Sequence, residues 1–361
     1  MDMFSDNNHS VYNGKRLTVE LYGASHAEEI GVLVDGLKKG DGYDEGELLS
    51  FMARRRASIN SYSTTRIEDD LPIVLSGAKG GVFNGEKFKA VVKNKNTKSA
   101  DYQNVIKVPR PSHADFVGWS KYGKGFDYRG GGKFSGRMTV GLCIVGGICK
   151  QLLEKKGITI TAYIQSIGNI QGKSYKDGAE IKVSDQKFPL LDDGVKEDML
   201  KEIEQARLDA DSVGGKIECV VQGMPVGVGE FMFDSIEGVI SRLAFAVPAV
   251  KGIEFGTGFD LTKMRGADAN DQFDVKDGKV ITTTNHNGGI NGGISNGNDI
   301  AFGVAVKPTP SISKPQQSVD LETLCKKELI IKGRHDTCIT VRAVPVIEAI
   351  TAIAIYDLIT E

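Results

Sequence analysis

The order of strand-like and helix-like segments is the feature that most constrains the fold of this chain. Strand patterns, rich in β-branched and aromatic residues, occur at 16–22, 71–77, 158–168 and 216–223. Helical spacing of apolar residues occurs at 44–56, 137–156, 195–212, 235–247 and 344–359. The two kinds follow one another unevenly, without regular strand–helix alternation. The pattern therefore favours an α+β fold over a doubly wound parallel sheet.

Nothing in the chain marks a domain boundary or a nucleotide-binding fold. No Pro- or Ser-rich tract and no long block of like charge resembles a linker, so we expect a single domain over 1–361. Residues 1–13 are expected to form a disordered or loosely held N-terminus. No GxGxxG motif follows a strand and no P-loop is present, so a Rossmann or Walker site is not expected.

Charge and composition exclude several classes of function. The formal net charge is −2, so no global basic field favours nucleic acid. No apolar run reaches about 18 residues, and no membrane span is expected. Five cysteines without a CxxC pair or a signal peptide indicate reduced thiols and a cytoplasmic protein. The histidines are scattered and show no metal-ligand spacing.

Glycine accounts for 44 of the 361 residues, about 12%, against a usual ~7%. Much of it is clustered at 123–136 and 285–298. Such clusters indicate tight turns and places where the backbone approaches another group closely.

Two histidines lie in short loops that suit proton transfer. His26 follows the strand-like run 17–21 and precedes the apolar run 30–34, so it is either an ordinary loop residue or a proton-handling group at a strand end. His113 follows Arg110, which Pro109 and Pro111 hold in a restricted backbone. A rigid Arg–His pair suits anion binding with proton transfer. A turn capped by Ser112 is the simpler interpretation, and the two can coexist.

Arginines and glycines provide three further candidate anion sites. Arg54, Arg55 and Arg56 end a predicted helix, where they either complement the helix dipole in solvent or form a fork for phosphate or carboxylate; Arg66 follows in a Ser/Thr-rich loop. Three consecutive glycines, 130–132, can offer backbone N–H groups to an anion, or can simply form a flexible loop.

The third candidate is the sequence of Arg334, His335 and Asp336. In an extended segment Arg334 and Asp336 share a face and His335 opposes them. Asp336 is then either a salt-bridge partner or a base kept ionised by its neighbour. Together with the loops above, this composition is typical of a site for a small, multiply anionic substrate handled without a metal.

Six motifs in order resemble the chorismate synthase family. They are GASHAEEIGVLVDG (23–36), RPSHAD (110–115), DYRGGGKFSGR (127–137), NHNGGINGGISNG (285–297), KPTPSI (307–312) and GRHDTCITVRAVPVIEA (333–349). Each is similar to a family signature, such as GESHG, RPGHAD, DYRGGGRSSAR and GRHDPC. The resemblance spans roughly residues 17–358.

This resemblance implies a fold, an activity and partners. The implied fold is a β-α-β sandwich of antiparallel sheets with helices packed between and around them. The implied activity is that of a lyase in the shikimate pathway of aromatic amino-acid biosynthesis: trans-1,4 elimination of phosphate from 5-enolpyruvylshikimate-3-phosphate, giving chorismate. The family requires reduced FMN without net redox change, and usually forms a homotetramer. No insertion resembles a nicotinamide site for NADPH, so an external flavin reductant is expected.

The resemblance also assigns roles to residues at matching positions. His26 is expected to protonate the departing phosphate, His113 to stabilise the reduced flavin, and Asp336 to move a proton from the flavin. The residues expected to bind the anionic substrate are Arg55, Arg110, Arg137 and Arg334. The residues expected to contact flavin are Lys133, Ser135, Ala249, Gly292, Lys307, Thr309, Ser311 and Arg334. For His26 this favours chemistry over an ordinary loop position.

Several positions depart from the family pattern. They are Ala24, Ala27, Ser61, Lys133, Phe134, Gly136, Pro248 and Thr337. Ser61 falls where many members carry a further substrate-binding arginine, and Phe134 replaces a serine that contacts flavin. The alternative function is therefore a divergent flavin- or anion-binding paralogue with weakened or altered activity. Retention of His26, His113 and Asp336 favours the active enzyme.

Overall fold

The computed structural model describes residues 9–57, 68–96, 107–331 and 336–359. The chain forms two compact units. The first unit comprises Met1–Ile144, Leu200–Gly214 and Pro308–Ile339, and the second comprises Val145–Met199, Gly215–Lys307 and Thr340–Glu361. Each unit is assembled from stretches far apart in the sequence, and the prediction of one domain over the whole chain stays a prediction.

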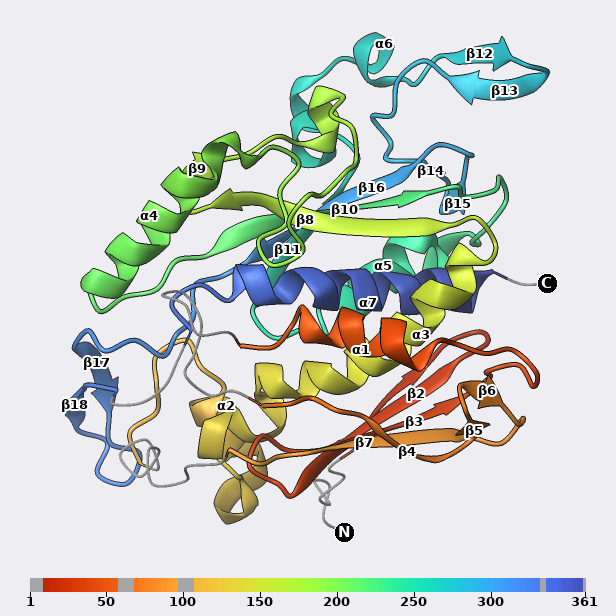
Figure 1. Cartoon of the computed structure of the whole chain (residues 1–361). Helices are drawn as coiled ribbons and strands as arrows, with labels where there is room; N and C mark the ends of the chain where they lie inside the picture. Colours follow the sequence, from red (N-terminus) through yellow and green to blue (C-terminus); the bar gives the residue numbers. More distant parts are fainter. Residues whose placement is uncertain (1–8, 58–67, 97–106, 332–335, 360–361) are drawn as a thin grey trace. The chain divides into compact units, whose positions relative to one another are not determined.

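A five-stranded antiparallel sheet forms the centre of the first unit, in the order β1-β2-β3-β7-β4; Figure 1 labels β2, β3, β7 and β4 of this sheet. Its strands are β1 (His9–Asn13), β2 (Thr18–Gly23), β3 (Glu29–Asp35), β4 (Ile73–Ser76) and β7 (Phe88–Lys93). Ile30, Val32 and Val34 alternate along β3 with almost no exposed surface, so one face of the sheet carries the core. A hairpin of β5 (Ala78–Lys79) and β6 (Val82–Phe83) extends this region.

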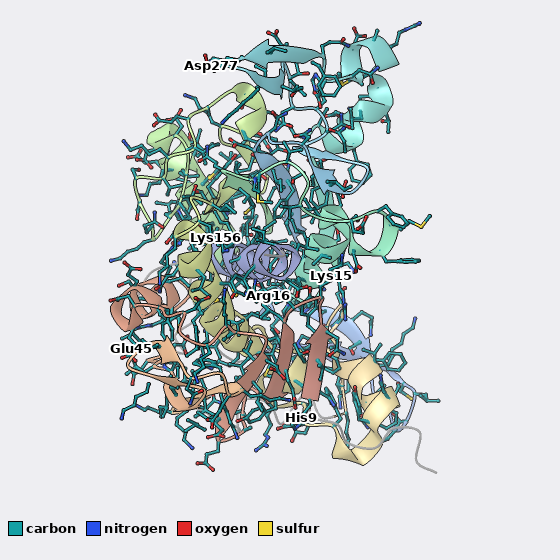
Figure 2. The ribbon with its side chains drawn as sticks, turned by 90° about the vertical axis from the view of Figure 1, so that its right-hand side faces the viewer. His9, Lys15, Arg16, Glu45, Lys156 and Asp277 are labelled. Atoms are coloured by element: carbon teal, nitrogen blue, oxygen red, sulfur yellow. The ribbon has the colours of Figure 1, made fainter. Side chains whose placement is uncertain are left out.

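Part of the segment 1–13, which was expected to be disordered or loosely held, forms the N-terminal strand of that sheet. Residues 9–13 pair along their whole length with β2, from His9 opposite Tyr22 to Asn13 opposite Thr18. The imidazole of His9, marked in Figure 2, also stacks on the ring of Tyr22 with a centroid distance of 5.5 Å. The segment expected to be loosely held therefore contains an ordered strand; residues 1–8 lie outside the described residues.

The first helix of this unit begins where its cap predicts, but it ends at Ala53 and not at the predicted Arg56. In α1 (Glu45–Ala53) the side chain of Asp44 accepts a hydrogen bond from the backbone N–H of Glu47 at 2.8 Å, as an N-cap should. The remaining elements of this unit are α2 (Asp115–Tyr122), η2 (Gly123–Gly125), η3 (Arg129–Phe134), η4 (Gly136–Met138), β17 (Gln316–Val319) and β18 (Lys326–Leu329).

Two helices carry the chain between the units. They are α3 (Thr139–Glu154) and α4 (Lys196–Leu208). In α3 a Cβ at Gly141 would lie only 2.4 Å from Cδ2 of Leu21, so glycine lets the first turns of the helix approach β2. The glycines that weaken this helix by propensity are therefore positions of close packing.

The second unit is built on another five-stranded antiparallel sheet, in the order β11-β16-β10-β8-β9. Its strands are β8 (Thr159–Ile167), β9 (Ile170–Gln171), β10 (Gly215–Gln222), β11 (Val250–Phe255) and β16 (Ile300–Val306). Figure 1 shows α5 (Ile236–Ala244) and α7 (Thr340–Leu358) along one face of this sheet. The carboxylate of Glu348 in α7 accepts a hydrogen bond from the N–H of Ala162 in β8 at 3.1 Å.

Short elements complete the second unit. They are η5 (Tyr175–Asp177), η6 (Asp193–Val195), η7 (Met232–Asp234), η8 (Gly258–Lys263), α6 (Gly266–Ala269), β12 (Phe273–Lys276), β13 (Lys279–Thr282), β14 (Ile290–Asn291) and β15 (Ile294–Ser295). Asp277, labelled in Figure 2, forms the turn of the β12–β13 hairpin with φ +50°.

The α+β fold class with antiparallel sheets is confirmed. The helix predicted over 344–359 begins earlier, at Thr340, because buried residues continue the pattern up to that point. The helix predicted over 137–156 begins two residues later, because Gly136–Met138 form a 3₁₀ turn first. Within the described ranges, no helix combines the length and hydropathy that a membrane span requires.

A substitution at Gly146 can test how closely α3 packs against α7 in the second unit. Alanine normally stabilises a helix by about 1 kcal/mol relative to glycine. A Cβ at Gly146, however, would lie 2.3 Å from Cα and 2.4 Å from the carbonyl oxygen of Ala349 in α7. We expect Gly146→Ala to lower the free energy of unfolding by about 1–3 kcal/mol, measured as the urea midpoint.

The matched control for this change is Gly266→Ala in α6. A Cβ at Gly266 meets no heavy atom within 4 Å, so its midpoint should stay unchanged or rise. Equal midpoints for the two variants would contradict the close approach of Gly146 to Ala349.

Candidate active site

The loop that carries His26 is fixed at both ends. It joins β2 to β3, and the N–H of Ala27 donates to the carbonyl of Ala24 at 3.1 Å, closing a tight turn. The N–H of Ser25 donates to the carbonyl of Gly132 at 3.1 Å. The side-chain amide of Asn94 donates to the carbonyl oxygens of Ala24, at 3.2 Å, and Ala27, at 2.8 Å. The backbone on either side of His26 is therefore tied to two other segments.

The glycine triplet lies against both predicted catalytic histidines. Gly130, Gly131 and Gly132 have φ values of +57°, +83° and +54°. A Cβ at Gly130 would lie 2.5 Å from Cε1 of His26, and a Cβ at Gly131 would lie 3.5 Å from Nε2 of His113. Only glycine fits the first position, because both the backbone angle and the space exclude a side chain. The triplet thus brings the two imidazoles to one loop.

His113 is paired with a carboxylate that the sequence analysis did not single out. Nδ1 of His113 lies 2.7 Å from Oδ1 of Asp115, which begins α2 and is buried. Both oxygens of Asp115 also accept from Arg110, from Nε at 2.7 Å and Nη2 at 2.8 Å. Nη1 of Arg110 donates to Oγ of Ser311 at 3.0 Å. The ion pair of Arg110 and Asp115 therefore fixes the carboxylate that contacts His113.

The charge state of Asp115 follows from these contacts. Burial opposes ionisation of the carboxyl, but hydrogen bonds from Arg110 and His113 outweigh it and hold the pKa of Asp115 well below its ordinary value. The position at the start of α2 also favours negative charge. An ionised carboxylate only accepts hydrogen bonds, so its position 2.7 Å from Nδ1 favours the His113 tautomer with the proton on that nitrogen. Nε2 is the ring nitrogen on the side of Gly131.

A second buried carboxylate, Asp70, holds two of the predicted substrate-binding arginines. Nη1 of Arg55 pairs with one oxygen of Asp70, and Nη1 of Arg137 pairs with the other. The three side chains are 4%, 8% and 2% exposed in the order Arg55, Arg137, Asp70. Nη2 of Arg55 also donates to Oγ1 of Thr139 at 3.2 Å. Arg55 is therefore a buried fork, and the alternative of a solvated helix end does not describe it.

Arg137 keeps one nitrogen for a further partner. Its Nε donates to Oδ1 of Asn94 at 3.0 Å and its Nη1 contacts Asp70. Nη2 is buried, and no group in the described part of the chain accepts a hydrogen bond from it. A buried guanidinium nitrogen without an acceptor carries a desolvation cost that a bound anion would relieve. Since Arg55, Arg137 and Asp70 carry a net charge of +1, the cluster suits a phosphate or carboxylate.

The sequence departure at Phe134 has a packing explanation. The ring of Phe134 lies 6.4 Å from the ring of Tyr122 and 6.0 Å from that of Phe126. The Nζ of Lys133 lies 3.6 Å from the centroid of Tyr122 on the same cluster. Ser135 caps the following turn by accepting from the N–H of Arg137 at 3.2 Å. Phe134 therefore anchors the glycine-rich loop to α2.

Two of the predicted flavin-contacting residues, Thr309 and Ser311, lie in the segment of the first unit that begins at Pro308. Ser311 accepts from Arg110, and the carbonyl of Thr309 accepts from Oγ of Ser212 at 2.7 Å. Oγ1 of Thr309 is buried, and among the described residues it has no hydrogen-bond partner. An unsatisfied buried hydroxyl suits a polar ligand atom. These residues fit a group that carries phosphate and heteroatoms, as FMN does.

Three predicted flavin-contacting residues belong to the second unit. The N–H of Lys307 donates to the carbonyl of Ala249 at 2.9 Å, so these two lie together. Ala249 has φ +75°, an uncommon angle for a residue with a side chain. Gly292 is exposed in the turn between β14 and β15, and a Cβ there meets nothing within 4 Å.

The C-terminal motif is described only in part. Asp336 is half-buried, and the next residue, Thr337, accepts through its carbonyl from the N–H of Val213 at 2.9 Å. A Cβ at Gly136 would lie 3.8 Å from Cδ1 of Ile339, so this segment contacts the end of the glycine-rich loop. The predicted positions Ser61, Arg66, Arg334 and His335 lie outside the described residues.

Sequence reasoning missed Asp70, Asn94 and Asp115. Asp115 stands inside the RPSHAD motif, two residues after His113, and its position at a helix start could have indicated it. Asp70 is one of three consecutive acids, Glu68, Asp69 and Asp70, and nothing in the sequence distinguishes it from its neighbours. Asn94 follows a strand without any motif.

Comparison with known proteins shows similarity along nearly the whole chain. A family model described as chorismate synthase matches residues 17–360. A chorismate synthase of Dehalococcoides mccartyi is 41% identical over 348 residues, covering 96% of this chain and 95% of the relative. One of Thermococcus kodakarensis is 42% identical over 344 residues, covering 95% and 96%.

A solved structure supports the fold independently. A crystal structure of chorismate synthase superposes with a TM-score of 0.75 at 23% identity, covering 96% of this chain and 92% of the other. At that identity the likeness concerns the fold.

A measurement of protein stability, without any assay of activity, can test the buried cluster of Arg55, Arg137 and Asp70. Asp70→Ala would leave Arg55 and Arg137 buried without their shared counter-ion, and we expect the free energy of unfolding to fall by about 3–5 kcal/mol. The neighbouring Asp69, whose side chain is 58% exposed, pairs with Lys95 at the surface and provides the matched control, Asp69→Ala. Urea midpoints should drop in the first variant and barely move in the second. A midpoint for Asp70→Ala close to that of the wild type would contradict the cluster.

Proposed function

The chain belongs to the chorismate synthase family, and from that premise we propose which side chains bind the substrate and the cofactor and which transfer protons. The family's reaction removes phosphate and a carbon-6 hydrogen from 5-enolpyruvylshikimate-3-phosphate and gives chorismate. The chain is accordingly a lyase of the shikimate pathway that uses reduced FMN. No comparison favours the alternative of a non-catalytic flavin- or anion-binding paralogue. Phe134, the main departure behind that alternative, has the structural role described above.

The observation that carries the assignment of roles is the glycine triplet between His26 and His113. Two imidazoles that lie against one loop, which continues into a buried arginine with an unused nitrogen, would provide proton transfer and anion binding together. Arg137 and Arg55 would bind anionic groups of the substrate, with Asp70 fixing both guanidinium planes. His26 would donate a proton to the departing phosphate.

His113 would act through Nε2, because the carboxylate of Asp115 lies against Nδ1 and favours the proton on that nitrogen. Arg110 was predicted to bind substrate directly, and that contact stays a prediction. Its three hydrogen bonds to Asp115 and Ser311 support a second role, orienting His113 through Asp115. Asp336, adjacent in sequence to the segment that reaches Gly136, would accept a proton late in the reaction.

Reduced FMN, when bound, supplies the electron-rich ring that the elimination requires. In the first unit the groups that would hold it are Lys133, Ser135, Thr309 and Ser311. Ala249, Gly292 and Lys307, which belong to the second unit, are also predicted to contact flavin, and those contacts stay a prediction. Arg334, outside the described residues, was predicted to touch both substrate and flavin.

Three further properties follow from the family and not from the described residues. We propose a homotetramer, which sedimentation equilibrium would test. We propose that an external reductant supplies the reduced flavin; NADPH consumption by the purified chain with FMN would contradict this. We propose a cytoplasmic location, in keeping with cysteines that form no disulfide in the described ranges; fractionation of the source cell would test it.

The decisive activity test is anaerobic release of phosphate from 5-enolpyruvylshikimate-3-phosphate with chemically reduced FMN. We expect the wild type to form chorismate, and His113→Ala and Asp336→Ala to lower kcat by about 10²–10⁴-fold, the usual contribution of a positioned acid or base. His9→Ala, which removes an exposed histidine on β1, is the control and should keep full activity. A wild type that binds reduced FMN but releases no phosphate would overturn the proposal.

A further inference from the structure

Asn94 occupies a junction between the anion-binding arginine and the loop of His26. It follows β7 directly, and its backbone N–H donates to the carbonyl of Glu28 at 3.0 Å, continuing the pairing of β7 with β3. Its side chain therefore lies next to the loop between β2 and β3. The residue contacts neither ring of the histidines in any interaction described above, so its effect would be indirect.

Both the nitrogen and the oxygen of the Asn94 side-chain amide form hydrogen bonds. Its Nδ2 donates to the carbonyl oxygens of Ala24 and Ala27, at 3.2 and 2.8 Å, on either side of His26. Its Oδ1 accepts from Nε of Arg137 at 3.0 Å. Two carbonyl acceptors and one guanidinium donor fix the orientation of the amide, because the reverse orientation would set oxygen against oxygen. No other side chain of this size satisfies all three partners.

The same contact controls the orientation of Arg137. Asp70 holds Nη1 and Asn94 holds Nε, so the guanidinium plane is fixed and Nη2 is the nitrogen left for an anion. The amide group of Asn94 therefore connects the His26 loop directly to the guanidinium group that carries that nitrogen.

We propose that Asn94 is a positioning residue that couples anion binding at Arg137 to proton donation by His26. The proposal rests on the proposed function and deepens it, because it names the group that sets the distance between the bound phosphate and its proton donor. An error of about 1 Å in such a distance can reduce a rate by about 10²-fold.

The test is a double-mutant cycle on phosphate release under the anaerobic conditions above. Asn94→Asp keeps the shape and the acceptor for Arg137 but turns the two donor contacts into repulsion with Ala24 and Ala27. We expect kcat to fall about 10–100-fold in the wild-type background, and less than about threefold in the His26→Ala background. The matched control is Asn84→Asp, at an exposed turn, which should change kcat less than about twofold.

The outcomes separate the two claims. A wild type that releases no phosphate overturns the proposed function. An active wild type with an unaffected Asn94→Asp overturns the positioning role alone. An equal loss in both backgrounds also overturns it, because the loss would then not pass through His26.

If Asn94→Asp does not fold, a second variant, Asn94→Ala, tests the proposal through the NMR signals of the histidine rings. In Asn94→Ala, the imidazole resonance assigned to His26 by its loss in His26→Ala should shift or broaden in the flavin-free protein, while those of His9 and His286 stay in place. A His26 resonance unchanged from the wild type would overturn the proposal without any activity measurement.

Discussion

The close approach of the Gly130–Gly132 backbone to two imidazoles is the constraint on which the site depends. All three glycines have positive φ, and a side chain at Gly130 would occupy the space of His26. The carbonyl of Gly132 also fixes the loop of His26 through Ser25. Because the same segment continues into Arg137, one short stretch contacts His26 and His113 and leads directly to a buried arginine.

Two buried carboxylates make this arrangement rigid. Asp70 holds Arg55 and Arg137, and Asp115 holds Arg110 beneath His113. In each case a buried acid, which would be unfavourable alone, is stabilised by guanidinium groups whose orientation it fixes in return. The site therefore carries its positive charge on side chains that are already oriented before a ligand binds, which reduces the cost of ordering them.

Much of the fold was predictable from the sequence, and several residues of the candidate site were named from its motifs. Long periodic segments such as 195–212 and 235–247 contain the helices α4 and α5, because their apolar spacing repeats over several turns, although the helices end earlier, at Leu208 and Ala244. His26 and His113 were found through ordered motifs. Asp70 and Asn94 were not, because their roles depend on Arg137, which lies 67 and 43 residues further along the chain. Contacts of that separation leave no local pattern in a single sequence.

The most direct test of this account is single-turnover phosphate release by Gly130→Ala compared with Gly178→Ala. Both glycines have left-handed backbone angles, φ +57° and ψ 22° at Gly130 and φ +68° and ψ 21° at Gly178, so the backbone strain is matched, but a Cβ at Gly178 meets nothing within 4 Å. The account predicts that Gly130→Ala loses about 10²-fold or more in rate while its urea midpoint resembles that of Gly178→Ala, which stays active. Equal rates in the two variants would contradict the placement of His26 against the triplet.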